Sequence, residues 1–170
     1  MDSPADSIAD GVSRRLDPRW ISVQRVHGAV LAGILSIASL VAVMVAWVAS
    51  RTLALGLLLL PLWAVVIAAV AWHLYRWPAI AFGHASYRVD EAGLEIVNGV
   101  YFRTTTNVPR SRIQHTDVSQ GPLERRYGLG TLVVYTAGTQ HSQVSLPGLD
   151  FTVAQRIRAH LLPRDHGDAV

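Results

Sequence analysis

Cysteine and lysine are both absent from this 170-residue sequence, and charge is scarce. Without cysteine there is no disulfide framework, no thiolate metal site and no cysteine nucleophile. Charged residues make up 16% of the chain, against about 25% in typical soluble domains. The net charge of +3 is too small to indicate nucleic-acid binding. The shortage is concentrated in residues 26–82, which contain only Arg51 and Arg76 as charged residues. This distribution argues against a purely soluble protein with a single core.

Two uncharged, apolar runs fill that stretch. Residues 26–50 would span about 37 Å as a helix, which exceeds a hydrocarbon core of about 30 Å. Residues 52–75 form the second run, and only Arg51 separates the two. Two adjacent uncharged runs of this length in so short a chain argue against buried core helices. A cleaved signal peptide is also disfavoured, because a second span follows directly behind the first. We therefore predict a transmembrane helical hairpin over residues 20–82.

Arginines around the two runs predict the orientation of the hairpin. Positive residues stay on the cytoplasmic side of a membrane. Only Arg51 lies in the turn, whereas six arginines flank the outer ends of the spans: Arg14, Arg15, Arg19, Arg25, Arg76 and Arg88. The expectation is a multi-pass protein of the cell inner (plasma) membrane with both termini cytoplasmic.

Beyond the hairpin, residues 83–163 alternate in short runs that turn residues separate. Residues 87–89 and 94–97 flank a loop that ends in Gly93, which indicates a β-hairpin. A strand is expected over residues 100–108, ended by Pro109. Further strands are expected over residues 113–119, 131–136 and 143–146. A helix over residues 151–162, capped by Asp150, should point Val153, Ile157 and Leu161 inward.

These elements predict a small β-barrel or sandwich closed by a C-terminal helix. Residues 1–19 are expected to be a disordered tail, because they alternate Asp, Ser, Arg and small residues. Residues 164–170 form a second predicted tail.

Two motifs in the β region resemble the bacterial PH-like membrane proteins of the YdbS-like family. They are Arg103 with Asn107-Val108-Pro109-Arg110-Ser111-Arg112-Ile113-Gln114-His115, and Gln120-Gly121-Pro122-Leu123-Glu124-Arg125-Arg126-Tyr127-Gly128-Leu129-Gly130-Thr131-Leu132; Leu146-Pro147-Gly148-Leu149 fits the same pattern. The resemblance covers about residues 20–162. It implies a membrane α-helical hairpin plus a small β-barrel of pleckstrin-homology-like type closed by a C-terminal α-helix. That fold has seven strands and six are counted here, so one is short or missed. The family has no settled biochemical activity.

Candidate catalytic and metal-binding patterns fail one by one, so we expect no enzyme, no cofactor and no metal. Gly128-Leu129-Gly130 lacks the third glycine of a dinucleotide-binding turn, and no Gly-x-Ser-x-Gly elbow is present. The histidines lack metal-ligand spacing. Asp117 and Glu124 are expected to be separate surface charges. His115 and Asp117 share one strand face, where a structural hydrogen bond is favoured over catalysis.

The window from Arg103 to Arg126 is basic, with five arginines against two carboxylates. Its candidate docking or anion-binding surface comprises Arg103, Arg110, Arg125 and Arg126. Arg112, and as an alternative Arg125, would instead hydrogen-bond backbone carbonyls. The remaining motif residues are expected to be structural: Pro109, Arg112, Ile113, Gln114, His115, Gly121, Pro122 and Gly128.

Two functional hypotheses remain open. The preferred one is a non-catalytic, membrane-anchored module that scaffolds or regulates a membrane protein complex, by offering a strand edge or groove to a peptide. The other is a module that senses anionic lipid through its arginines. The expected partners are the lipid bilayer and a membrane or membrane-associated protein. Homo-oligomers are possible, and no nucleic acid is expected.

Overall fold

The structure is a computed structural model, which describes residues 8–50, 52–137 and 143–162. The chain forms two compact units. One comprises residues 21–80, and the other combines residues 1–20 with residues 81–170. The second unit is therefore built from both sides of the helical hairpin in the sequence.

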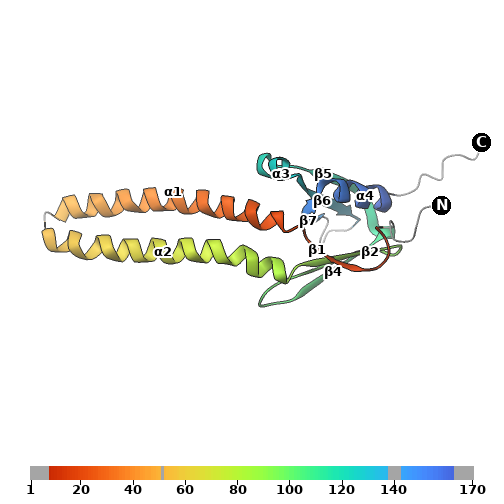
Figure 1. Ribbon diagram of the computed structural model, residues 1–170, viewed down its shortest axis with the longest axis horizontal. Coiled ribbons are helices and arrows are strands. Elements are labelled where there is room, and N and C mark those ends of the chain that lie inside the picture. The colour runs from red at the N-terminus through yellow and green to blue at the C-terminus, as the bar shows by residue number, and fades with distance from the viewer. Residues whose placement is uncertain (1–7, 51, 138–142, 163–170) are drawn as a thin grey trace, which may run out of the picture. The chain divides into compact units, whose positions relative to one another are not determined.

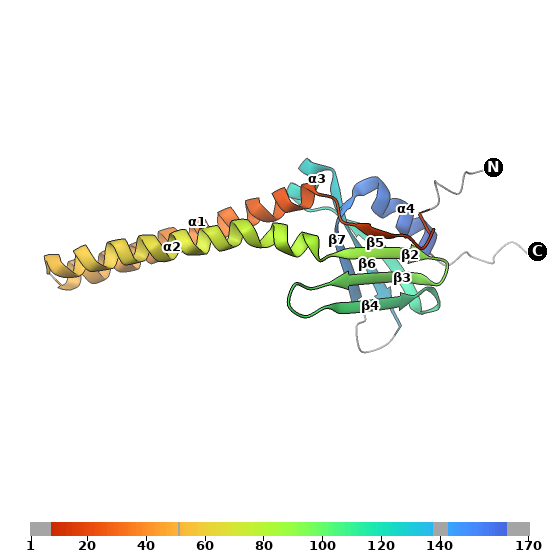
Figure 2. The ribbon, with the colours of Figure 1, turned by 60° about the horizontal axis from the view of Figure 1, so that its bottom comes forward.

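The first unit consists of two long helices, whose outermost residues belong to the second unit. Helix α1 spans Arg19–Ser50 and helix α2 spans Leu53–Gly83, and they run side by side (Figures 1 and 2). The indole nitrogen of Trp63 on α2 donates to the hydroxyl of Ser39 on α1 at 3.0 Å. In the most apolar 18-residue windows, 0% of the residues of α1 and 6% of those of α2 are buried. A core helix of a soluble protein would be mostly buried, so these apolar surfaces fit contact with lipid.

The second unit contains all the strands and is called the β domain below. A four-stranded antiparallel sheet, in the order β1-β2-β3-β4, forms its first layer. Its strands are β1 (Ser13–Arg15), β2 (Ser86–Asp90), β3 (Gly93–Asn98) and β4 (Thr104–Pro109). The predicted hairpin is confirmed as β2 and β3, with Val89 opposite Leu94. Strand β4 begins at Thr104 and not at Val100 as predicted. Residues 99–103 form a loop whose side chains Tyr101 and Phe102 are exposed, so their apolar character does not mark a buried strand.

The second layer is a three-stranded antiparallel sheet in the order β5-β6-β7. Its strands are β5 (Ile113–Ser119), β6 (Leu129–Thr136) and β7 (Gln143–Asp150). Between β5 and β6 lies a short helix, α3 (Pro122–Tyr127), which was not predicted from the sequence. Helix α4 (Phe151–Leu161) begins where predicted, whereas β7 continues to Asp150 beyond the predicted end at residue 146.

The core lies between the two sheets and under α4. Leu94 and Ile96 from β3 belong to the same buried cluster as Leu132 and Val134 from β6. Helix α4 adds Ala154, Ile157 and Leu161, which are fully buried, while Val153 packs on the edge of the cluster and is partly buried. The inward face predicted for α4 is therefore confirmed at Ile157 and Leu161.

The predicted closure into a barrel is wrong, because the two sheets stay separate. A single turn of 3-10 helix, η2 (Arg110–Arg112), connects β4 to β5 and interrupts strand hydrogen bonding between the layers. Among the described residues β4 pairs only with β3, and β7 only with β6. The domain therefore has open sheet edges.

The N-terminal segment also differs from its prediction. Residues 13–15 are not a disordered tail: they form β1, which pairs with β2 and completes seven strands in the described part of the chain. Leu16 is buried in the core, and the amide of Asp17 donates to the carbonyl of Gly148. A three-residue strand is too short to show a period of two, so only its pairing identifies it. Residues 1–7 and the predicted tail at 164–170 lie outside the described residues.

Candidate functional site

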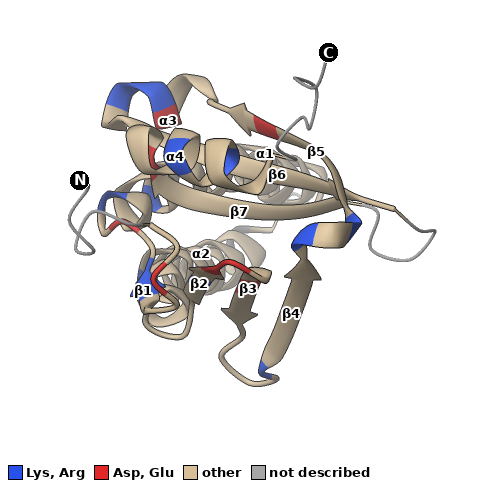
Figure 3. Ribbon diagram, turned by 90° about the vertical axis from the view of Figure 1, so that its right-hand side faces the viewer, with Lys and Arg blue, Asp and Glu red and all other residues tan. Residues whose placement is uncertain are grey.

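The outer edge of β4 borders a groove of about 390 Å³. Strand β4 lies at the margin of its sheet, with hydrogen-bonded pairing on the β3 side only (Figure 3). The groove is lined by all of β4 together with Arg112, Thr136, Ala137 and Val144. One wall is therefore a strand whose outer edge has no partner among the described residues, and the other is the end of the second sheet.

The residues along this edge carry no charge. Thr104, Thr105 and Asn107 are exposed and Thr106 is half-buried, while the strand's proline, Pro109, stands at its end. Natural proteins protect unpaired edges with charged side chains, proline or bulges. This edge lacks charge and proline over residues 104–107, and β-branched threonines favour extended backbone. It is suited chemically to accept another strand.

The arginines of η2 exchange the roles that the sequence suggested. Arg110 was expected at the surface for docking, yet its guanidinium donates to the carbonyl of Leu162 at the end of α4 at 3.2 Å. Arg112 was expected to hydrogen-bond carbonyls. Its side chain is exposed, lines the groove, and makes no hydrogen bond to a described residue. Strand spacing would put both side chains on one face, but a 3-10 helix turns by about 120° per residue and points them apart.

The remainder of the first motif shapes the start of β5. Ile113 is 5% exposed and belongs to the core. Gln114 is exposed and lies at an irregularity in the pairing between β5 and β6. The imidazole Nε2 of His115 lies 3.1 Å from Oδ1 of Asp117, which confirms the predicted contact, and both side chains are exposed. This part of the motif is structural in its contacts.

The second motif builds the α3 turn. Gly121 and Pro122 open the helix, and the carboxylate of Glu124 accepts both the Gly121 amide at 2.7 Å and the Thr131 hydroxyl at 2.8 Å. Gly128 ends the helix, and the side-chain amide of Gln120 donates to the carbonyl of Leu129. Glu124 and Asp117 make separate contacts, as expected, but Glu124 is half-buried and hydrogen-bonded and is not the surface charge that the sequence suggested.

The four arginines predicted as one docking surface lie on three separate elements. Arg103 belongs to the loop between β3 and β4, Arg110 to η2, and Arg125 and Arg126 to α3, where both are exposed. The basic segments on α3 and at the start of β4 lie on opposite sides of the domain (Figure 3). The motif therefore does not gather these four charges into one patch.

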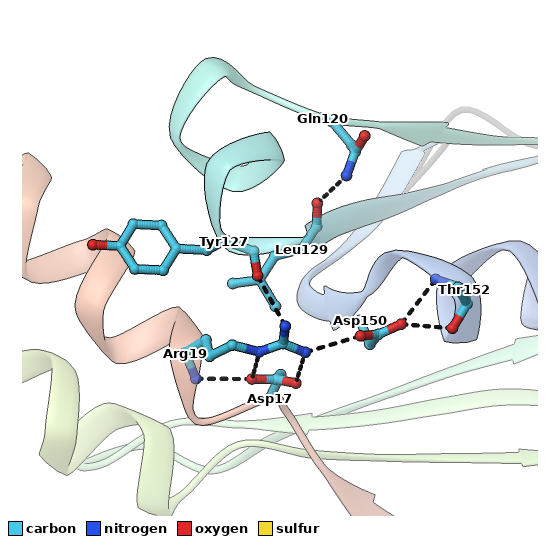
Figure 4. Close-up of polar contacts among 7 residues, drawn as sticks. All are labelled: Asp17, Arg19, Gln120, Tyr127, Leu129, Asp150 and Thr152. Carbon is cyan, nitrogen blue, oxygen red and sulfur yellow. Dashed lines mark hydrogen bonds and ion pairs between the residues drawn. The ribbon is translucent and has the colours of Figure 1, made fainter.

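A polar cluster that was not predicted from the sequence links the start of α1, the end of α3 and the start of α4 (Figure 4). The guanidinium of Arg19 pairs with Asp17 at 2.7 Å and with Asp150 at 2.9 Å, and it donates to the carbonyl of Tyr127 at 3.0 Å. Asp150, the most distant partner, lies 131 residues from Arg19 in the sequence. The local signal was Asp17-Pro18, a typical helix start, since the Asp17 carboxylate accepts the Arg19 amide.

Both carboxylates of this cluster are favoured in the charged form. The hydrogen bond from the Arg19 side chain holds the pKa of Asp17 below its usual value. The pKa of Asp150 is lowered first by the Thr152 hydroxyl, with Arg19 contributing. The carboxylate of Asp150 also accepts the Thr152 amide at 2.9 Å, so the predicted cap of α4 is confirmed. The cluster connects the start of α1, the end of α3 and the start of α4 through hydrogen bonds and ion pairs of Arg19.

No group of three or more potential metal-ligating side chains (His, Cys, Asp or Glu) occurs within residues 8–50, 52–137 and 143–162. The geometry instead defines a class of protein: two apolar helices long enough to cross a membrane, carrying a two-layer β domain of PH type with a C-terminal helix.

Comparison with known proteins identifies the family within this class. Residues 21–165 match the bacterial PH domain family, so the chain belongs to that family. The UPF0699 transmembrane protein YdbS of Bacillus subtilis (strain 168) is 42% identical over 72 residues. That alignment covers 42% of this chain and 43% of the relative. No solved structure matches. The YdbS-like resemblance is thus confirmed, and the protein is a membrane protein; the family description names a domain and no catalytic activity.

Proposed function

We propose that this protein is a non-catalytic, membrane-anchored interaction module that scaffolds or regulates a membrane protein complex. The observation that carries the proposal is the open, uncharged edge of β4 along its groove. A partner segment in extended form would add a strand there. Main-chain hydrogen bonds would supply affinity, and the groove would select side chains.

The groove favours a partner segment with acceptor groups near one end. Arg112 has no hydrogen-bond partner among the described residues and stands at the Pro109 end of β4. A carboxylate or a free carbonyl on the added segment would pair with it. The partner is a membrane or membrane-associated protein, because the helical hairpin restricts the domain to the membrane surface. A second copy of this chain is the competing occupant.

Two neighbouring proline variants test strand addition in the full chain. Successive backbone N–H groups of a strand point to opposite edges. Of Thr105→Pro and Thr106→Pro, one removes a hydrogen bond to β3 and the other removes an N–H from the free edge. The variant that leaves the unfolding midpoint unchanged should lose partner crosslinking.

The crosslinks are measured with a photoreactive amino acid at Thr104 in native membranes, and with the same group at Arg156 on α4 as the control. Crosslinks at Thr104 that survive in both proline variants, or equal products from Thr104 and Arg156, would contradict the proposal. A product with the mass of two copies of this chain would identify the partner as a homo-oligomer.

The proposed orientation places both termini and the β domain on the cytoplasmic face of the inner (plasma) membrane. It rests on the six arginines at the outer ends of the spans. The chain has no cysteine, so single cysteines report without background. Ser50→Cys should react with an impermeant thiol reagent on whole cells, whereas Glu91→Cys should react only after lysis. The reverse pattern would invert the orientation.

A further inference from the structure

A second pocket, of about 370 Å³, lies at the end of the β domain where the chain joins both membrane helices. Its lining includes Arg15 from β1, His84 after α2, and Arg103 from the loop between β3 and β4. Ser13, Ser86 and the backbone of Gly99 contribute polar groups. We infer that this pocket binds the headgroup of an anionic phospholipid, and that residues 99–103 dip into the same leaflet beside it.

The charge of the pocket fits an anionic group. Arg15 and Arg103 are exposed, and neither side chain makes a hydrogen bond or ion pair with a described residue. Arginines that serve the fold here are paired, as Arg19 is with Asp17 and Asp150. Two unpaired guanidinium groups in one pocket leave a set of donors matched to phosphate oxygens.

The neighbouring loop supplies an apolar contact. Tyr101 is 81% exposed and Phe102 is 89% exposed. Aromatic side chains are enriched at the level of lipid headgroups, where an apolar body and a polar tip both find suitable surroundings. Gly99 holds the loop in a tight turn: its φ is +119°, and a Cβ there would lie 1.9 Å from the carbonyl oxygen of Phe102. The aromatic pair is therefore presented on a closely folded loop.

Chain connectivity places the pocket near the membrane surface in any orientation of the domain. Aromatic residues and Arg76, with its guanidinium over the Trp72 ring, indicate that α2 reaches the interface around residues 72–77. From Arg76 to Gly83 the helix rises by about 10 Å, and the headgroup region is about 5–8 Å thick. Gly83 and His84 line the pocket themselves, and Arg15 precedes α1 by four residues. Gly83 thus lies about 2–5 Å beyond the headgroup region, so the bilayer is the occupant within reach of the arginine side chains.

The test uses the full chain in nanodiscs of phosphatidylcholine, alone or mixed with phosphatidylglycerol. A nitroxide on Phe102→Cys should show membrane contact, as high oxygen and low nickel-chelate accessibility, that increases with phosphatidylglycerol. The same label on Glu91→Cys, in the turn at the opposite end of β3 (Figure 2), controls for the affinity of the label itself and should stay in water.

Arginine variants separate the pocket from the loop. Arg15→Gln and Arg103→Gln should each raise the phosphatidylglycerol fraction needed for half-maximal contact by about fivefold. Arg156→Gln, an exposed arginine on α4 without a partner among described residues, should leave it unchanged. Membrane contact equal at positions 102 and 91, or contact independent of phosphatidylglycerol and of both pocket arginines, would overturn the inference. Neither result bears on strand addition at β4.

Discussion

Substituting Gly148 by alanine should destabilise the β domain severely, although it adds one methyl group. Gly148 lies in β7 with φ of +74°, and an added Cβ would stand 2.6 Å from Cγ and 3.0 Å from Cβ of Trp20. Carbon atoms pack optimally at about 3.5–4.0 Å. The indole could rotate, but the Trp20 Cβ moves only with the backbone of α1. That backbone is held by the hydrogen bond from the Asp17 amide to the Gly148 carbonyl at 2.8 Å.

Two effects add to the expected loss. A left-handed backbone costs a non-glycine residue about 1–2 kcal/mol, and forced overpacking costs about 1–3 kcal/mol. Gly148→Ala should therefore lower the free energy of unfolding by about 2–5 kcal/mol. Gly83→Ala is the control, since nothing lies within 4 Å of its added Cβ and its φ is ordinary. It should not destabilise the domain.

The assay is pulse proteolysis of the detergent-solubilised full chain across a urea gradient, which counts unfolded β domain. Gly148→Ala and Gly83→Ala are then both measured in a Trp20→Ala background. There the contacts with the indole disappear while the residue-20 Cβ at 3.0 Å remains, so Gly148→Ala should cost less than in wild type but at least the backbone part of about 1–2 kcal/mol. A loss that matches the Gly83→Ala control, or that is identical with and without the indole, would refute this account of the Leu146-Pro147-Gly148-Leu149 motif.

Three further outcomes are expected in the same assay. Asp150→Asn keeps an N-cap and loses the ion pair to the half-exposed Arg19, so it should cost at most about 1 kcal/mol, whereas Asp150→Ala should cost about 1 kcal/mol more. Because the folded pKa of Asp150 is lowered, the stability that its carboxylate contributes is present above its ordinary pKa of 3.8 and is lost as pH falls through the folded pKa. Wild type and Asp150→Asn should therefore converge in acid, and a gap that persists at low pH contradicts the assignment. Thr116 is fully buried and its hydroxyl has no hydrogen-bond partner among the residues that the structure describes, so Thr116→Val should stabilise by about 1 kcal/mol, and a lower urea midpoint would reveal a partner for the hydroxyl. Arg110→Ala should lower the free energy of unfolding by about 1 kcal/mol, because the hydrogen bond to the Leu162 carbonyl is lost. Arg112→Ala should leave it unchanged within about 0.5 kcal/mol. A larger loss for Arg112→Ala than for Arg110→Ala would support the roles suggested by the sequence.

Local patterns in the sequence were sufficient for the elements whose hydrogen bonds or solvent exposure repeat over short distances. The two membrane helices follow from long apolar runs, because only length and hydrophobicity are needed. The β2–β3 hairpin follows from alternation around a loop that ends in glycine. Helix α4 follows from its Asp150 cap and the spacing of Ile157 and Leu161. Each of these signals lies within one element or one turn.

The tertiary structure alone decided what depends on partners far away in the chain. Strand β1 has no period of its own, and it exists because β2, about 70 residues later, supplies its hydrogen bonds. Arg110 and Arg112 look equivalent in sequence, but the turn of η2 sends one to the end of α4 and the other to the groove. Arg15 and Arg103 share a pocket only because β1, which precedes the membrane hairpin in the sequence, pairs with β2, which follows it. Side-chain roles of this kind are set by long-range packing, which a residue's neighbours in sequence do not encode.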